Sequence, residues 1–278
     1  MTASYVSPAL FVNWQGESGR QVFPVGRLLN LSGDSYEFAY LAAAKEAQQL
    51  GFVPFVAFPE LERVYISSEL PAFFKNRVLQ PARPDYPEHL AELGLDPATA
   101  TPIAILARSG GRRVTDPLEV FAELVPTTDA TRVEAHFFVR GIRHVAGAEE
   151  VLTQLAPGDS LTPQPEPTNA VNPKALLLAR PDTRRVGYVP DYLAEDLNGL
   201  TVSDPSLLIQ VVRVNAAPSP SQQRLLCRLS ISATAPRPHR GARFEPIASD
   251  ALRLEAGELV ATSVPRLTRT EDAAAELR

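Results

Sequence analysis

The chain has 278 residues, of which 45% are hydrophobic and 21% are charged. It can therefore bury a substantial core, and its length favours two domains. A formal net charge of -5 argues against a protein that coats nucleic acid, because such binding needs many lysines and arginines on phosphates. Any nucleic-acid contact should be local. The single cysteine, Cys227, excludes an internal disulfide and a multi-cysteine metal site.

Neither a targeting segment nor a membrane span is indicated. The first residues lack a basic stretch followed by an apolar run, and no segment approaches the ~20 apolar residues of a membrane helix. We therefore expect a soluble cytoplasmic protein without a membrane partner, with association with the nucleoid as an option. The 26 prolines and 15 glycines predict short strands and rigid turns. The expected fold is mainly β with short helices, in the α+β class.

The first part of the chain has the pattern of a β-meander. Apolar runs at residues 9–14 and 21–29 flank a polar turn and predict a hairpin. Alternating aromatic residues at 36–40 predict a third strand. An alanine-rich helix is expected over residues 41–50, ended by Gly51, because glycine readily adopts the left-handed conformation found after helices.

A less regular segment follows. Apolar spacing predicts a helix over residues 69–78, and Pro81, Pro84 and Pro87 predict an extended path after it.

The stretch at residues 109–113 holds a glycine pair beside two arginines. We interpret it as a solvated turn after a short apolar strand at 103–106 rather than as a phosphate-binding loop. Residues 116–124 fit either a short helix or a strand, and both interpretations remain open. The polar, turn-rich residues 126–131 mark the expected domain boundary.

The second half has the pattern of a small barrel. Apolar runs at residues 207–214 and 224–230 predict a closing hairpin, with Cys227 inside it as a buried small hydrophobe. The elements expected before it are a strand, a Gly-Ile-Arg-His turn at residues 141–144, a short helix, a strand, a polar loop over 166–174, an apolar strand over 175–179, a strand end at 186–190 and a closing helix.

Three short motifs in this half resemble the HIRAN domain, a module of some helicase-like DNA repair ATPases and of short bacterial proteins. They are Gly-Ile-Arg-His at 141–144, Pro-Thr-Asn-Ala-Val-Asn-Pro-Lys-Ala at 167–175 and Gly-Tyr-Val-Pro at 187–190. The resemblance implies a small OB- or SH3-like β-barrel over residues 132–234. It also implies recognition of a single-stranded DNA end with a free 3′-hydroxyl.

The matching positions are the candidate DNA-binding residues. A pocket for a DNA end needs a ring for a base to stack on, polar groups for the terminal hydroxyl and cations for flanking phosphates. At the matching positions, His144 stands where DNA-binding members have tyrosine, and Val171-Asn172 stands where they have Tyr-Asp. The candidates are Arg143, His144, Asn169, Asn172, Lys174, Arg184, Arg185 and Tyr188.

Each candidate also has a purely structural interpretation. Arg143 could pair with Glu149 or Glu150, and Tyr188 could belong to the core. The asparagines at 169 and 172 are ordinary turn residues. The joint occurrence of the motifs is what favours function.

The first third of the chain resembles the small N-terminal subdomain of HipA-type kinases. The resemblance rests on the strand meander, on Phe-Phe-Lys-Asn-Arg at residues 73–77 and on Arg83-Pro84. We therefore divide the chain into a HipA-like region at 1–126, the HIRAN-like region at 132–234 and an extension of unknown role at 235–278. No kinase catalytic motif follows the first region.

No enzymatic chemistry is indicated. The four histidines lie far apart without metal-ligand spacing, so we expect neither a metal nor another cofactor. The sequence thus predicts a non-enzymatic protein that binds single-stranded DNA or DNA 3′ ends, in repair or genome maintenance, with protein or self contacts through the first region. The alternative hypothesis is a protein-interaction or regulatory module of a toxin-antitoxin-like or DNA-maintenance assembly.

Overall fold

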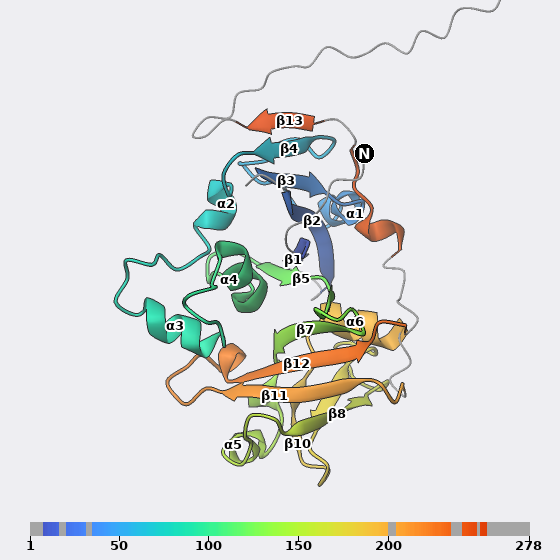
Figure 1. The fold of residues 1–278 in the computed structure, drawn as a ribbon. Coiled ribbons are helices and arrows are strands. Elements are labelled where there is room, and N and C mark those ends of the chain that lie inside the picture. The colour runs from blue at the N-terminus through green and yellow to red at the C-terminus, as the bar shows by residue number, and fades with distance from the viewer. Residues whose placement is uncertain are drawn as a thin grey trace, which may run out of the picture.

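The computed structural model describes residues 8–16, 21–31, 35–199, 204–234, 241–248 and 251–254. Two mostly antiparallel sheets lie one above the other, with helices α4 and α6 between them (Figure 1). The expected mainly-β fold with short helices is confirmed. Residues 17–20 of the expected polar turn and most of the C-terminal extension lie outside the described residues.

The first sheet has the order β13-β4-β3-β2-β1-β5. Its strands are antiparallel except that β13 runs parallel to β4. The predicted hairpin is confirmed as the β1–β2 pair, whose register shifts between Val12 and Asn13. The strands are β1 (Leu10–Gln15), β2 (Val22–Leu31), β3 (Ser35–Tyr40), β4 (Val64–Ser67), β5 (Leu118–Ala122) and β13 (Ala251–Leu254).

Aromatic side chains fill the core of this sheet. Phe38 stacks on Phe58 with ring centroids 4.1 Å apart, and both are fully buried. The Tyr40 hydroxyl accepts from Phe55 N and donates to the Phe58 carbonyl, each at 2.7 Å, which ties the 52–58 loop to β3. The helices of this first unit are α1 (Ala43–Gln48), α2 (Ala72–Lys75), α3 (Tyr86–Glu92) and α4 (Pro102–Ser109).

Three local predictions for this unit were wrong. The apolar run after Thr101 is helix α4 rather than a strand, and Gly110 ends it at φ 76°. The segment around Pro87 is helix α3, with this proline in the first turn, where its missing N–H costs no bond. The helix expected over residues 69–78 is a single turn, α2. The open choice at residues 116–124 is resolved as strand β5.

The second sheet has the order β10-β9-β8-β11-β12-β7-β6. It curls so that Arg140, just after β7, forms one antiparallel bridge with Tyr188 of β10, while no continuous ladder closes the sheet into a barrel within the described residues. The strands are β6 (Val125–Pro126), β7 (Arg132–Phe138), β8 (Ser160–Pro165), β9 (Leu176–Ala179), β10 (Arg185–Tyr188), β11 (Leu208–Val214) and β12 (Leu225–Ser232).

Short helices cover this second unit, and its core is mainly aliphatic, with Phe137 as an aromatic member. Cys227 lies in that core with no exposed surface, and burial raises the pKa of its thiol, which confirms the prediction of a buried hydrophobe. The helices are α5 (Ala148–Leu152), α6 (Asp191–Gly199) and the 3-10 turns η1 (Ile142–His144) and η2 (Ser221–Gln223). None of the described helices is long and apolar enough to cross a bilayer.

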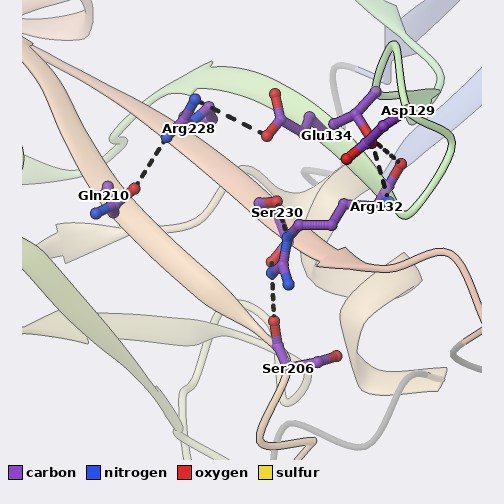
Figure 2. A network of polar contacts seen from close by, with 8 residues as sticks. Asp129, Arg132, Glu134, Ser206, Gln210, Arg228 and Ser230 are labelled. Carbon is purple, nitrogen blue, oxygen red and sulfur yellow. Dashed lines mark hydrogen bonds and ion pairs between the residues drawn. The ribbon is translucent and has the colours of Figure 1, made fainter.

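A polar network lies on β7, β11 and β12 (Figure 2). Arg132 donates to the Ser230 hydroxyl and to the Ser206 carbonyl, both at 2.6 Å. Arg228 donates to Gln210 at 3.0 Å and lies 3.8 Å from Glu134. These bonds fasten neighbouring strands on the face that carries the arginines.

The two units pack tightly against each other. Tyr192 of α6 stacks on Phe121 of β5 with centroids 4.2 Å apart. Arg140 pairs with Glu119 of β5, which links the end of β7 to the first sheet. A shared apolar cluster includes Ile105 of α4 and Phe138 of β7.

The chain returns to the first unit after β12. Ile247 N donates to the Tyr40 carbonyl at 2.9 Å, and Ala42 N donates to the Glu245 carbonyl at 2.8 Å. The 3-10 turn η3 (Ala242–Phe244) packs Phe244 edge-on against Phe11. Part of the sequence-defined extension at residues 235–278 is therefore integrated in the first sheet.

Candidate functional site: the surface around Tyr188

Tyr188 is held between two glycine-containing segments. Gly141 adopts φ 66°, and a Cβ there would lie 2.9 Å from the Tyr188 ring, so the ring packs on bare backbone. Gly187 is needed for a similar reason, since its Cβ would lie 2.6 Å from the Arg140 carbonyl oxygen. Two of the three motifs thus meet at one place, because the bridge between Arg140 and Tyr188 requires both glycines.

The turn after Gly141 presents Arg143 and His144 to solvent. Ile142 anchors the turn in the core. Arg143 Nε donates to His144 Nε2 at 3.0 Å, which makes that ring nitrogen an acceptor. The alternative pairing of Arg143 with Glu149 or Glu150 is not found among the described residues, and Glu149 lies 3.2 Å from Arg224 instead.

Glu166 contacts three of the candidates, Tyr188, Asn169 and Arg185. Sequence reasoning missed it. Its Oε2 accepts from the Tyr188 hydroxyl at 3.0 Å and from Asn169 Nδ2 at 3.1 Å. Its Oε1 lies 3.9 Å from Arg185. Burial, followed by the hydrogen bond and charge of Glu166, raises the pKa of Tyr188. Its position at the start of the polar loop, beside two prolines, was the available signal.

The loop at residues 166–174 is built by its two asparagines. Asn169 Oδ1 accepts from Val171 N at 3.0 Å and from Asn172 N at 3.1 Å. Asn172 Oδ1 accepts from Lys174 N at 2.8 Å, while its amide donates to Asp191 Oδ1 at 2.7 Å. The interpretation of both residues as turn formers is confirmed.

Most of the candidate cations have a carboxylate partner. Lys174 Nζ lies 3.7 Å from Glu195, and Arg184 Nη2 lies 2.8 Å from Asp182. The Arg184 side chain lowers the pKa of Asp182, chiefly through its hydrogen bond. Arg143 has no carboxylate within 4 Å in the part of the chain that the structure describes.

The structure brings some candidates together and leaves others apart. Tyr188, Asn169 and Arg185 meet at Glu166, whereas Asn172 and Lys174 face α6. Arg184 bonds within its own turn. The described residues hold no group of three or more histidine, cysteine, aspartate or glutamate side chains suited to a metal ion.

No family model and no curated protein matches the chain. A crystal structure of a Lactobacillus plantarum protein, solved by a structural genomics consortium, is similar with 20% sequence identity. The match covers 36% of this chain and 96% of that chain, with a TM-score of 0.29. A likeness of this size carries no argument about function.

Proposed function

We propose that the protein binds single-stranded DNA or DNA 3′ ends, and that its second unit is a HIRAN-like small barrel that is left open, among the described residues, beside the single Arg140–Tyr188 bridge. The observation that carries the proposal is the contact between the Gly141 turn and Tyr188. This contact sets a half-buried ring against the turn that carries Arg143 and His144. A ring for base stacking next to a guanidinium that has no carboxylate partner among the described residues is the minimum that a single-strand site needs.

Glu166 supplies a carboxylate acceptor for a terminal hydroxyl beside Tyr188, and Asp191 supplies a second carboxylate at the other end of the same loop. The chain lacks an aspartate in the 167–175 motif, and Asn172 stands in its place. The Asn172 amide nevertheless donates a hydrogen bond to Asp191 Oδ1 at 2.7 Å, and the Asn169 amide donates one to Glu166 Oε2 at 3.1 Å. A carboxylate accepts a hydroxyl proton in a charge-assisted bond, which is stronger than a bond to an amide.

The first experiment compares variants in their binding of a fluorescent single-stranded oligonucleotide. Tyr188→Ala should weaken binding about fivefold to a hundredfold, since stacking contributes roughly 1–3 kcal/mol per base. Tyr188→Phe keeps the ring and should retain most of the affinity. Arg143→Ala should weaken binding and reduce its salt dependence.

Arg63→Ala is the matched control, because Arg63 is an arginine of the first unit that pairs with Glu60 at 2.7 Å. Its DNA affinity should equal that of the wild type. Wild-type affinity in both Tyr188→Ala and Arg143→Ala would overturn the proposal.

The second candidate function is a protein-interaction module without enzymatic activity. It is favoured by the carboxylates beside Lys174, Arg184 and Arg185, which leave a surface of mixed charge rather than a basic groove. Affinity purification from native lysate separates the two functions. A stoichiometric protein partner that persists after nuclease treatment supports the second candidate, and co-purified DNA supports the first.

A further inference from the structure

Arg143 and His144, in the turn that packs against Tyr188, are bonded to each other. Arg143 Nε donates to His144 Nε2 at 3.0 Å, and both side chains are exposed to solvent. Because an imidazole nitrogen accepts a hydrogen bond only when it carries no proton, this bond requires a neutral His144 ring with its proton on Nδ1. Within the described part of the chain, His144 makes no other side-chain hydrogen bond and no ion pair.

Among the described residues, no carboxylate lies within 4 Å of the His144 ring. The turn packs against β10, α5 and η2, and η2 has no charged side chain. The carboxylates of α5 and of the loop beside β10 each face a cation, in the pairs Glu149 with Arg224, Glu150 with Arg184 and Glu166 with Arg185. The Tyr188 hydroxyl of β10 bonds to Glu166. The surroundings of the ring therefore supply no anion that would hold it in its charged form.

His144 is set apart from the other histidines by its exposure. Burial, and then Arg108 and Arg228, lower the pKa of His136 to about 3, and burial lowers the pKa of the half-buried His89. His239 lies outside the described residues. Histidine ordinarily changes its charge between about pH 5 and pH 8. Within the described residues, His144 is therefore the histidine placed to couple this change to a ligand on the surface.

We propose that the binding of single-stranded DNA at the Tyr188 surface is coupled to the protonation of His144. When the ring is protonated, both of its nitrogens donate, so Nε2 no longer accepts from Arg143 and the guanidinium is released. The turn then presents two cations to the phosphates of a strand that stacks on Tyr188. This coupling rests on the proposed function and adds its regulation by pH.

The direction of the pH dependence follows from the two states of the ring. In the free protein the bond from Arg143 favours the neutral ring, whereas a DNA phosphate favours the charged ring. The complex therefore binds more protons than the free protein. Its affinity should rise as the pH falls through the range in which histidine titrates, and should level off on either side.

The test measures the affinity of the whole protein for a rhodamine-labelled oligothymidylate at pH 8 and at pH 5.5, since thymine does not titrate in this range. We expect about fivefold tighter binding at pH 5.5, the effect of one exposed charge pair. The slope of the logarithm of affinity against the logarithm of salt should also steepen by about 0.7, the value for one more phosphate contact on a single strand.

His144→Gln keeps a hydrogen-bonding side chain but cannot gain a charge, so it should abolish both differences between the two pH values. His89→Gln is the matched control and should keep both, because His89 lies on α3 of the first unit. Nitrogen-15 NMR of the free protein adds a readout without DNA. At pH 8 the His144 proton should lie on Nδ1, and Arg143→Ala should move it in part to Nε2.

The coupling and the proposed function fail in different ways. Equal affinities at the two pH values, or acid-strengthened binding that His144→Gln retains, overturn the coupling and leave DNA binding standing. A wild-type His144 with its proton on Nε2 at pH 8 overturns the coupling whatever the affinities. No binding at either pH overturns the proposed function, and the coupling falls with it.

Discussion

At the scale of single residues, the structure explains why glycine stands at positions 141 and 187 of the motifs. Gly141 and Gly187 are required because Tyr188 and the Arg140 carbonyl occupy the space that their side chains would take. The sequence showed which residues form the motifs. It did not show that Glu166 connects them, because the contact between Glu166 and Tyr188 spans 22 positions and depends on how β8 and β10 flank β9.

Gly141→Ala and Gly147→Ala form a matched pair. Both glycines have positive φ, 66° and 75°, but a Cβ at Gly147 meets nothing within 4 Å. Gly147→Ala should cost about 1–2 kcal/mol of unfolding free energy, for the left-handed backbone alone. Gly141→Ala should cost at least about 1 kcal/mol more, because it displaces Tyr188. Urea denaturation measures both unfolding free energies. Equal losses in the two variants would contradict the contact between Gly141 and the Tyr188 ring.

At the scale of elements, apolar runs and the alternation of apolar with polar residues predicted the strands well. The β1–β2 hairpin, β3, β9 and the β11–β12 pair all follow from apolar runs bounded by turn residues. Helix α4 was missed because Ile103 and Ile105 are β-branched and suggested a strand. Its boundary residues were the better signal, since Thr101 caps the first turn and Gly110 ends the helix.

The cap of α4 provides a direct test of that explanation. Thr101 Oγ1 accepts from Ala104 N at 3.1 Å. Thr101→Ala should lower the unfolding free energy by about 1 kcal/mol. Thr99→Ala, at a neighbouring exposed threonine, should change it by less than about 0.5 kcal/mol. Thermal or urea unfolding of the two variants distinguishes them, and equal effects would reject the capping role.

At the scale of the whole molecule, long-range pairing decides the architecture. The sequence suggested an added extension after residue 234, whereas β13 joins β4 and the segment at 241–248 bonds to Tyr40 and Ala42. No local pattern predicts a partner nearly 200 residues away. The same holds for the packing of α4 and α6 between the sheets.

His136 makes the junction of the units sensitive to acid. Burial first, and then Arg108 of α4 and Arg228 of β12, lower its pKa from 6.5 to about 3. Between these values the unfolded chain binds a proton that the folded chain does not, so stability falls as the pH falls through this window. Titration of His136 changes the unfolding free energy by at most about 1.4 kcal/mol per pH unit.

His136→Gln should therefore flatten the loss of stability between about pH 6 and pH 4. Urea unfolding at a series of pH values measures the difference from the wild type. An unchanged pH dependence in the variant would show that the proton is taken up elsewhere.

The central claim is that the Tyr188 surface recognises a DNA end. The most direct measurement compares the affinity of the protein for one single-stranded oligonucleotide with a free 3′-hydroxyl and for the same oligonucleotide with a 3′-phosphate. We expect the free end to bind about tenfold more tightly, because the Glu166 carboxylate beside Tyr188 repels the phosphate, and we expect both affinities to fall with salt. Equal affinities, or no binding, would contradict the account.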